Sequence, residues 1–122
     1  MTIKTLLIVD DSMTARLLIQ AMIQELQPEW NFLQAASADE AIDILQNSSV
    51  DYFSIDYNMP GKTGLDLIHI IRQSHPKNRI VLLTANTQPQ IEKKAKQLDS
   101  ICVYKPLTDA VIKQIEKYFI HD

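Results

Sequence analysis

Five polar residues, each close behind a short apolar run, carry the side chains that could do chemistry in this chain: Asp10, Asp11, Asp56, Thr84 and Lys105. Clustered carboxylates repel one another, and burial increases the cost. A divalent cation relieves this repulsion, and Mg²⁺ takes oxygen ligands, usually one or two carboxylates with phosphate oxygens and water. The cation and the ammonium group would neutralise an incoming phosphoryl group. We therefore expect one carboxylate to attack phosphorus and form an acyl phosphate.

Asp56 is the best candidate for this nucleophile, because it stands alone at the end of a predicted central strand. Each element is weak evidence by itself, since Asp-Asp after a strand is a common helix cap and Lys105-Pro106 is an ordinary turn dipeptide. Their joint occurrence, each after the appropriate run, is far more specific.

The elements that must position these residues alternate along the chain. The first and fourth of the apolar runs are almost unbroken, as in strands that are buried on both faces of a parallel sheet. The predicted strands are Thr5–Val9, Asn31–Ala35, Tyr52–Ile55, Arg79–Leu83 and Ile101–Tyr104.

Helical spacing occupies the stretches between these strands. We expect Met13–Leu26 to direct Leu18 and Ile19 inward, and Ser37, Thr63 and Thr108 to cap three further helices. The weakest helical pattern is Pro89–Leu98. Five strands alternating with five helices predict right-handed crossovers and a doubly wound parallel sheet. Ligands of such sheets bind outside the carboxyl ends of the strands, where the five polar residues would meet.

Length and composition limit the alternatives. The 122 residues suit one compact domain, and a net charge of −3 argues against a nucleic-acid or anionic membrane surface. The single cysteine, Cys102, excludes an intrachain disulfide and a cysteine metal cluster. The early apolar run, Leu6–Val9, is too short for a signal peptide or a membrane span. These features predict a cytoplasmic protein with no membrane insertion.

The combined motifs resemble those of the CheY-like receiver domains of bacterial two-component signalling. The resemblance covers the whole chain, and its carriers are LLIVDDSMTAR (6–16), SIDYNMPGKTG (54–64), IVLLTAN (80–86) and VYKP (103–106). It implies a flavodoxin-like sheet in the order 2-1-3-4-5. It also implies that residues 1–122 form a single receiver domain without an output domain, a stand-alone response regulator.

The resemblance further implies the roles of the acidic residues. Asp56 would be the phosphoacceptor. The domain would catalyse only its own phosphorylation and dephosphorylation and is not expected to act as an enzyme on other substrates. Asp11 and Asp56 would bind Mg²⁺ directly, with the backbone carbonyl of Asn58 as a third ligand, whereas Asp10 would act through metal-bound water.

Three further residues receive roles in the same way. Thr84 would bond the phosphoryl oxygen and move when that group arrives. Lys105 would pair with the phosphoryl group, and its peptide bond to Pro106 is expected to be cis. Asn58 and Asn86 would influence the lifetime of the phosphoryl group.

Two positions depart from the family pattern. Receivers often carry an aromatic residue three positions before the lysine, where this chain has Cys102, so a threonine–aromatic switch is in doubt. Tyr104 lies on the same strand face but is not the equivalent residue. Leu98–Ser100 replaces a usual Gly-Ala turn, which predicts an irregular exit from the fourth helix.

The expected donor is a histidine kinase or a histidine phosphotransfer protein. Met13 and Leu17 form an apolar stripe beside the predicted site that could contact such a partner. The output would be a phosphorylation-dependent contact with an unidentified protein. A relay that passes the phosphoryl group to a phosphotransfer histidine remains open, and a non-phosphorylated interaction module is a weaker alternative. An aspartate-dependent phosphatase is disfavoured because Asn58 stands where its general acid would be.

Overall fold

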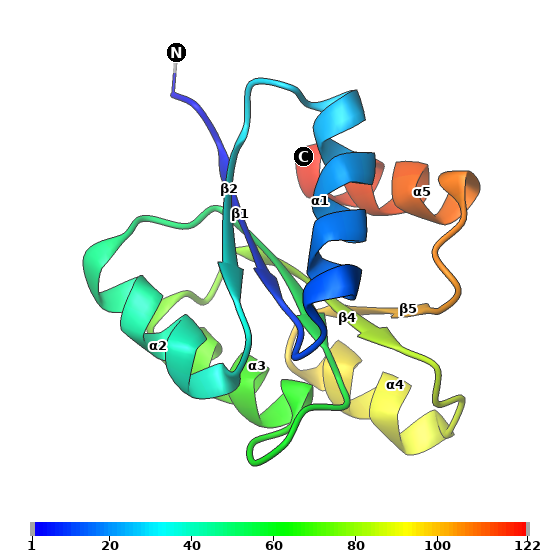
Figure 1. Cartoon of the computed structure of the whole chain (residues 1–122). Helices are drawn as coiled ribbons and strands as arrows, with labels where there is room; N and C mark the ends of the chain where they lie inside the picture. The colour runs from blue at the N-terminus through cyan, green and yellow to red at the C-terminus, as the bar shows by residue number, and fades with distance from the viewer. Residues whose placement is uncertain (1, 122) are drawn as a thin grey trace.

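The computed structural model describes residues 2–121, in which short strands alternate with helices (Figure 1). The strands are β1 (Thr5–Val9), β2 (Asn31–Ala35), β3 (Tyr52–Asp56), β4 (Arg79–Thr84) and β5 (Ile101–Tyr104). The helices are α1 (Met13–Leu26), α2 (Ala38–Asn47), α3 (Gly64–Ser74), α4 (Pro89–Gln97) and α5 (Asp109–Ile120). The predicted alternation is confirmed, and the predicted strand bounds hold to within one residue.

All five strands are parallel and lie in the order β2-β1-β3-β4-β5, which confirms the doubly wound arrangement. β1 pairs with both β2 and β3, so the chain reverses its direction of growth across the sheet at β1. The ends of β1 and β3 therefore border the crevice where ligands of such sheets bind.

Helices cover both faces of the sheet (Figure 1). One core cluster joins the sheet to α2, α3 and α4 through residues such as Phe53, Leu67 and Ile91. A second cluster joins the opposite face to α1 and α5 through residues such as Ile8, Ile19 and Ile115. Alternate side chains of β1 enter the two clusters, because successive residues of a strand point to opposite faces. Both faces of this interior strand are thus buried, as its unbroken apolar sequence predicts.

The inward face of α1 differs from the prediction at one position. Leu18 is 50% exposed, and the fully buried residues of this helix are Ile19 and Ile23. α1 lies against both the sheet and α5, and this contact buries a narrow stripe centred on the two isoleucines. The prediction from helical spacing was wrong at Leu18, because it assumed a buried stripe one residue wider than the structure shows.

Side-chain caps fix the beginnings of four helices. Ser12, Ser37, Thr63 and Thr108 each accept a hydrogen bond from the backbone N–H three residues later. The predicted caps at positions 37, 63 and 108 are therefore confirmed. α4 is different, because Gln88 at its start makes no side-chain capping bond.

The exit from α4 is irregular, as expected. Asp99 has a φ of 57°, a left-handed conformation that glycine usually adopts. Arg72 of α3 stabilises this turn by donating to the carbonyl oxygens of Leu98 at 2.7 Å and Asp99 at 2.9 Å. No helix within residues 2–121 is long and apolar enough to cross a membrane.

Candidate functional site

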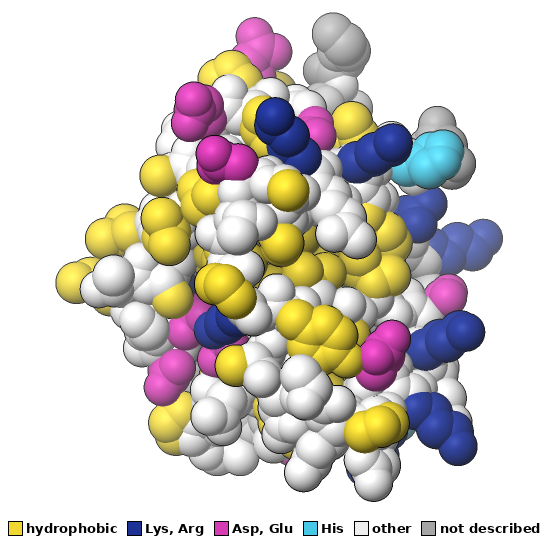
Figure 2. All heavy atoms as spheres, turned by 90° about the vertical axis from the view of Figure 1, so that its right-hand side faces the viewer, with side chains coloured by type: hydrophobic (Ala, Val, Ile, Leu, Met, Phe, Trp, Pro, Cys, Tyr) yellow, Lys and Arg dark blue, Asp and Glu magenta, His cyan; other side chains and the backbone are white. Residues whose placement is uncertain are grey.

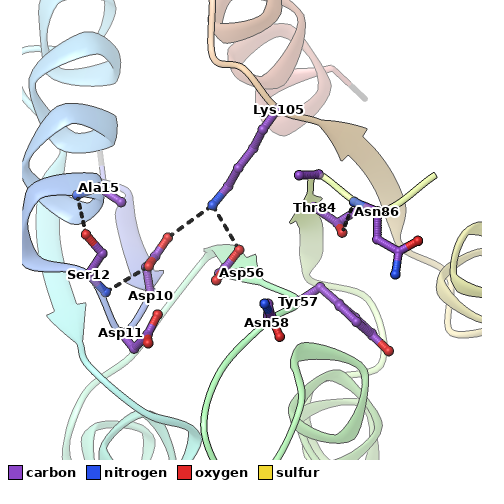
Figure 3. Close-up of a pocket in the computed structure, with 11 residues that line it drawn as sticks. Asp10, Asp11, Ser12, Ala15, Asp56, Tyr57, Asn58, Thr84, Asn86 and Lys105 are labelled. Atoms are coloured by element: carbon purple, nitrogen blue, oxygen red, sulfur yellow. Dashed lines mark hydrogen bonds and ion pairs between the residues drawn. The ribbon is translucent and has the colours of Figure 1, made fainter. Parts of the chain in front are cut away.

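The carboxyl edge of the sheet opens into a cleft of about 680 Å³. Figure 3 shows the Lys105 side chain reaching across this cleft toward Asp10 and Asp56. Thr84 and Asn86 stand on one side of the ammonium group, and Asp11 lies on the other. All five predicted chemical residues line the cleft, together with Asn58. The structure therefore brings together residues from four strand ends that are up to 95 positions apart (105 − 10) in the sequence.

Asp10 is fixed by the junction between β1 and α1. Its N–H donates to the Ala35 carbonyl oxygen at 3.1 Å, and its Oδ1 accepts from the Ser12 N–H at 2.9 Å. Ser12 in turn caps α1 by accepting from the Ala15 N–H at 3.2 Å. The start of the helix and the orientation of the Asp10 carboxylate are thus set by the same residue.

Asp56 ends β3 and is almost entirely buried. Lys105 Nζ lies 3.0 Å from Asp56 Oδ1 and 3.7 Å from Asp10 Oδ2. Gly64 allows α3 to begin directly against this strand end, because a Cβ at position 64 would lie 2.5 Å from the Asp56 carbonyl oxygen. A larger residue at this position would displace the backbone that carries the carboxylate.

The environment of Asp56 disfavours its charge. Burial raises the pKa of this carboxyl above its ordinary value of 3.8, and the neighbouring charges of Asp10 and Asp11 raise it further. The hydrogen bond and the positive charge of Lys105 oppose this shift in pKa without cancelling it. The site consequently holds more negative charge than its own cation offsets.

The oxygen ligands in the cleft suit a hard divalent cation. One carboxylate oxygen from each of Asp10, Asp11 and Asp56 lies within 4.8 Å of the others. Asp10 Oδ2 is buried and has no hydrogen-bond partner among the described residues, since Lys105 at 3.7 Å is too distant. An orphaned buried carboxylate oxygen in an all-oxygen site fits Mg²⁺ and its bound water.

The hydroxyl side of the cleft depends on local bonds. Thr84 Oγ1 accepts from the Asn86 N–H at 2.9 Å, and Asn86 Oδ1 accepts from the Gln88 N–H at 3.0 Å. These two bonds lead from the buried end of β4 to Gln88, the residue that precedes α4. Thr84 is therefore linked to the start of that helix by two short-range hydrogen bonds.

The remaining predicted residues lie outside the cleft lining. Cys102 is half-buried and packs against the core cluster beneath α4, and burial raises the pKa of its thiol. Tyr104 pairs in register with Thr84, and its hydroxyl donates to Glu92 Oε2 of α4 at 2.7 Å. The Lys105–Pro106 peptide bond is cis, as the resemblance implies.

A protein-family comparison agrees with this geometry. The model of the response regulator receiver domain matches residues 6–116. The chain belongs to this family. Across 121 aligned residues the receiver domain is 33% identical to the chemotaxis protein CheY of Pseudomonas aeruginosa, covering 93% of this chain and 94% of that protein. It is 30% identical to CheY-3 of Vibrio cholerae, and the alignment covers 93% of this chain and 90% of that protein.

Solved structures match the receiver over almost its whole length. CheY4 of Vibrio cholerae has a TM-score of 0.87 at 23% identity, covering 98% of this chain and 100% of that one. The response regulator TrrA of Thermotoga maritima, solved with Mg²⁺ and BeF, has a TM-score of 0.81 at 26% identity and covers 95% and 99%. A CheX–CheY complex of Borrelia burgdorferi with BeF₃ and Mg²⁺ has a TM-score of 0.80 at 26% identity and covers 93% and 87%.

Two residues that shape the receiver's cleft carried no prediction of their own. Gly64 lies within a recognised motif, but its close contact with Asp56 depends on where α3 meets β3. Arg16 also lies within a motif, and its Nη1 donates to the Asp10 carbonyl oxygen at 2.7 Å. An arginine six residues after a strand-end aspartate, on the first turns of a helix, is the signal that could have indicated the second contact.

Proposed function

We propose that Asp56 accepts a phosphoryl group from the phosphohistidine of a histidine kinase or a histidine phosphotransfer protein. The observation that carries this proposal is the convergence of three carboxylates and one ammonium group around a buried carboxylate oxygen that lacks a hydrogen-bond partner among the described residues. An Asp56 oxygen forms a bond to phosphorus while the bond from phosphorus to the histidine nitrogen breaks. The products are an acyl phosphate and an imidazole, which takes up a proton from solvent.

The cleft residues divide this work. Asp11, Asp56 and the backbone carbonyl of Asn58 would hold Mg²⁺, and Asp10 would bind its water. When bound, the cation supplies positive charge for the phosphoryl oxygens. Lys105 already lies on the Asp56 carboxylate and is placed to pair with the group that arrives there. Thr84 would donate its hydroxyl proton to a phosphoryl oxygen while still accepting from Asn86.

The direct test uses a small phosphodonor with Mg²⁺ and follows acid-labile phosphate on the protein. Asp56→Asn should abolish labelling, because an amide oxygen is a poor nucleophile and the variant lacks one metal ligand. Asp43→Asn is the matched control, since Asp43 is exposed on α2 and should leave labelling unchanged. Retained labelling in Asp56→Asn would overturn the assignment of the phosphoacceptor.

We expect the phosphodonor protein to dock on α1 beside the cleft. Met13 is 64% exposed and Leu17 is 53% exposed, and Leu18 extends the same apolar face. Figure 2 shows hydrophobic side chains gathered on its left, where α1 lies, whereas basic side chains stand mainly on its right. An exposed apolar face of this kind suits the helices of a partner.

Leu17→Asp separates docking from chemistry. The variant should slow phosphotransfer from the cognate partner by about tenfold, a typical cost of a lost interface anchor. Its labelling by a small phosphodonor should be unchanged, because no catalytic group is altered. Ile120→Asp, at a 48% exposed position on the end of α5, should leave both rates unchanged. Equal partner-dependent rates in the two variants would remove α1 as the docking surface.

The proposed output is a contact with another protein that forms or breaks when Asp56 is phosphorylated. The local bonds from Thr84 to the start of α4 support this role, since they link the cleft to an outer helix. A relay would instead lose its phosphoryl group rapidly to a histidine phosphotransfer protein. Mixing the phosphorylated receiver with such a protein distinguishes these two roles.

A further inference from the structure

Arg16 of α1 borders the acidic cleft without pairing with any of its carboxylates. Its Nη1 donates to the backbone oxygen of Asp10 at 2.7 Å, and its Nε donates to Gln34 Oε1 of β2 at 3.1 Å. Gln34 Nε2 then donates to Gln20 Oε1, one helical turn beyond Arg16, at 2.7 Å. The half-buried guanidinium thus joins β1, β2 and α1 at one point.

This contact completes the restraint of Asp10. The N–H of Asp10 is bonded to Ala35, its Oδ1 to Ser12 and its carbonyl oxygen to Arg16. The remaining polar atom, Oδ2, is the buried oxygen that has no hydrogen-bond partner among the described residues. Every other polar group of Asp10 is therefore held so that this oxygen faces the cleft.

The same contact orients Asp11. The carbonyl that Arg16 holds belongs to the peptide linking Asp10 to Asp11, and a peptide unit is planar. Fixing its oxygen restricts rotation of the whole plane and therefore the position of the Asp11 Cα. Asp11 is exposed, and its carboxylate makes no side-chain hydrogen bond or ion pair with another residue in the range 2–121. Its placement near the other two carboxylates thus depends largely on its backbone.

We propose that Arg16 is a positioning residue for the metal site, acting through the peptide bond between Asp10 and Asp11. This inference rests on the proposed function, because it assumes that the three carboxylates bind Mg²⁺. An arginine suits the task because its planar fork reaches two acceptors in fixed directions, which a lysine ammonium does not. Its positive charge lies beside the acidic cluster without occupying an oxygen that the cation needs.

The test measures Mg²⁺ binding by calorimetry in the absence of phosphodonor, well below the melting temperature. Arg16→Met should weaken Mg²⁺ binding by about tenfold, within the range for residues that orient metal ligands. Arg16→Lys should recover part of this loss, because it can reach the Asp10 carbonyl but not Gln34 as well. Arg79→Met is the matched control, since Arg79 also donates to a backbone carbonyl, that of His121 at 2.7 Å, far from the cleft.

A second readout separates positioning from general loss of structure. In Arg16→Met, the Mg²⁺ concentration for half-maximal phosphorylation should rise by about tenfold, whereas the maximal rate at saturating Mg²⁺ should change by less than about threefold. If Arg16 had only a structural role, both Arg16→Met and Arg79→Met would lower the melting temperature, and neither would change the Mg²⁺ affinity. That result would overturn the proposal.

Asp11→Asn, measured alongside, distinguishes this inference from the proposed function. If Asp11→Asn weakens Mg²⁺ binding and Arg16→Met does not, the positioning role of Arg16 is wrong and the metal site stands. If Asp11→Asn also leaves Mg²⁺ binding unchanged, the metal site itself is wrong, and the inference about Arg16 falls with it.

Discussion

The two helix junctions that border the cleft are built differently. At the β1–α1 junction, Ser12 caps the helix and Arg16 bonds the strand-end carbonyl of Asp10, with a further link to β2. At the β4–α4 junction, the side-chain bonds of Thr84 and Asn86 reach only two residues along the chain, and Gln88 provides no cap. The side-chain bonds of the acidic half therefore reach several elements, whereas those of the hydroxyl half stay within residues 84–88.

This difference suits the two tasks of a phosphorylated receiver. A metal site binds tightly when its ligands are already in place, because no ordering cost arises on binding. A switch needs an element whose two positions differ by only a few kcal/mol, so that a new charge can change their populations. Under the proposed function, the β1–α1 junction would carry the first task and the β4–α4 junction the second.

The largest expected effect tests the acidic half. Asp10→Asn removes one negative charge where the orphaned oxygen faces the cleft, and should slow Mg²⁺-dependent phosphorylation about a hundredfold, at the upper end for residues that support a metal site. The initial rate of labelling by a small phosphodonor measures this effect. Asp66→Asn, in the capping box of α3, is the control and should keep the rate within about twofold. A small change in Asp10→Asn would show that the restraint on Asp10 serves folding alone.

Thermal stability provides the second test, because the clustered negative charges of the cleft should destabilise the folded state when no metal is present. Folding raises the pKa of Asp56, so its charged form destabilises the folded state. Asp56→Asn should therefore raise the melting temperature at neutral pH by about 2–5 °C in a domain of this size. The gap should narrow as the pH falls through the raised pKa of Asp56, and it should close below the ordinary value of 3.8, where the carboxyl is protonated in both states.

Mg²⁺ should reverse this order of stability. The wild type gains about 2.7 kcal/mol at a hundred times its dissociation constant, and the variant gains less because it has lost a ligand. Thermal unfolding with and without Mg²⁺ measures both differences. A variant that is less stable than the wild type in metal-free buffer would contradict the assigned destabilisation.

A weaker effect is expected from capping the helix at the β4–α4 junction. Gln88→Ser supplies a hydroxyl that can accept from the Ile91 N–H and should stabilise α4 by about 0.5–1 kcal/mol. Hydrogen exchange of the α4 amides should slow by about two- to fivefold. Thr108→Ser is the control, because α5 is already capped at that residue. Unchanged exchange in Gln88→Ser would mean that α4 is held by contacts other than its first turn.

The smallest expected effect concerns the bond that joins α4 to β5. The hydrogen bond to Glu92 is the main cause that raises the pKa of Tyr104 to about 12. Glu92→Gln should lower this pKa toward the ordinary value of 10.0, because the charge that opposes phenolate formation is removed. Ultraviolet titration measures the shift, and the curve of the Tyr104→Phe variant is subtracted to isolate the contribution of Tyr104. Glu116→Gln, whose carboxylate instead accepts from Gln27 at 2.7 Å, should leave the pKa of Tyr104 unchanged.

The fold followed from the sequence because each element carries its own signals. Short apolar runs between stretches of helical spacing indicated the strands. Ser37, Thr63 and Thr108 indicated where helices begin, and the structure confirms these positions. Leu18 was placed wrongly because helical spacing does not reveal how wide a stripe the sheet and α5 bury. That width depends on the packing of two helices far apart in the chain.

The set of residues that meet at the cleft could be predicted for a similar reason, but the contacts that hold those residues in place could not. Carboxylates at strand ends can be read from position alone, since parallel strands bring their carboxyl ends to one edge. The contact of Arg16 with a backbone oxygen and the close approach of Gly64 to Asp56 depend on distances between elements. Every residue carries a backbone carbonyl, so the sequence does not indicate which carbonyl a side chain will contact.

The aromatic cluster at the opposite end of the sheet has a practical consequence. Trp30 is the single tryptophan of the chain, and it packs on Tyr52 with ring centroids 4.9 Å apart, while Tyr52 stacks on Phe119 at 5.0 Å. Its indole therefore senses the junction of β2, β3 and α5, away from the carboxylates. We expect the emission of this fluorophore to change when the folded state is lost and to stay unchanged when the cleft is occupied, because the ring packs on Tyr52 rather than on a cleft residue. Trp30 would then serve as an internal reference for folding in experiments that test the proposed switch.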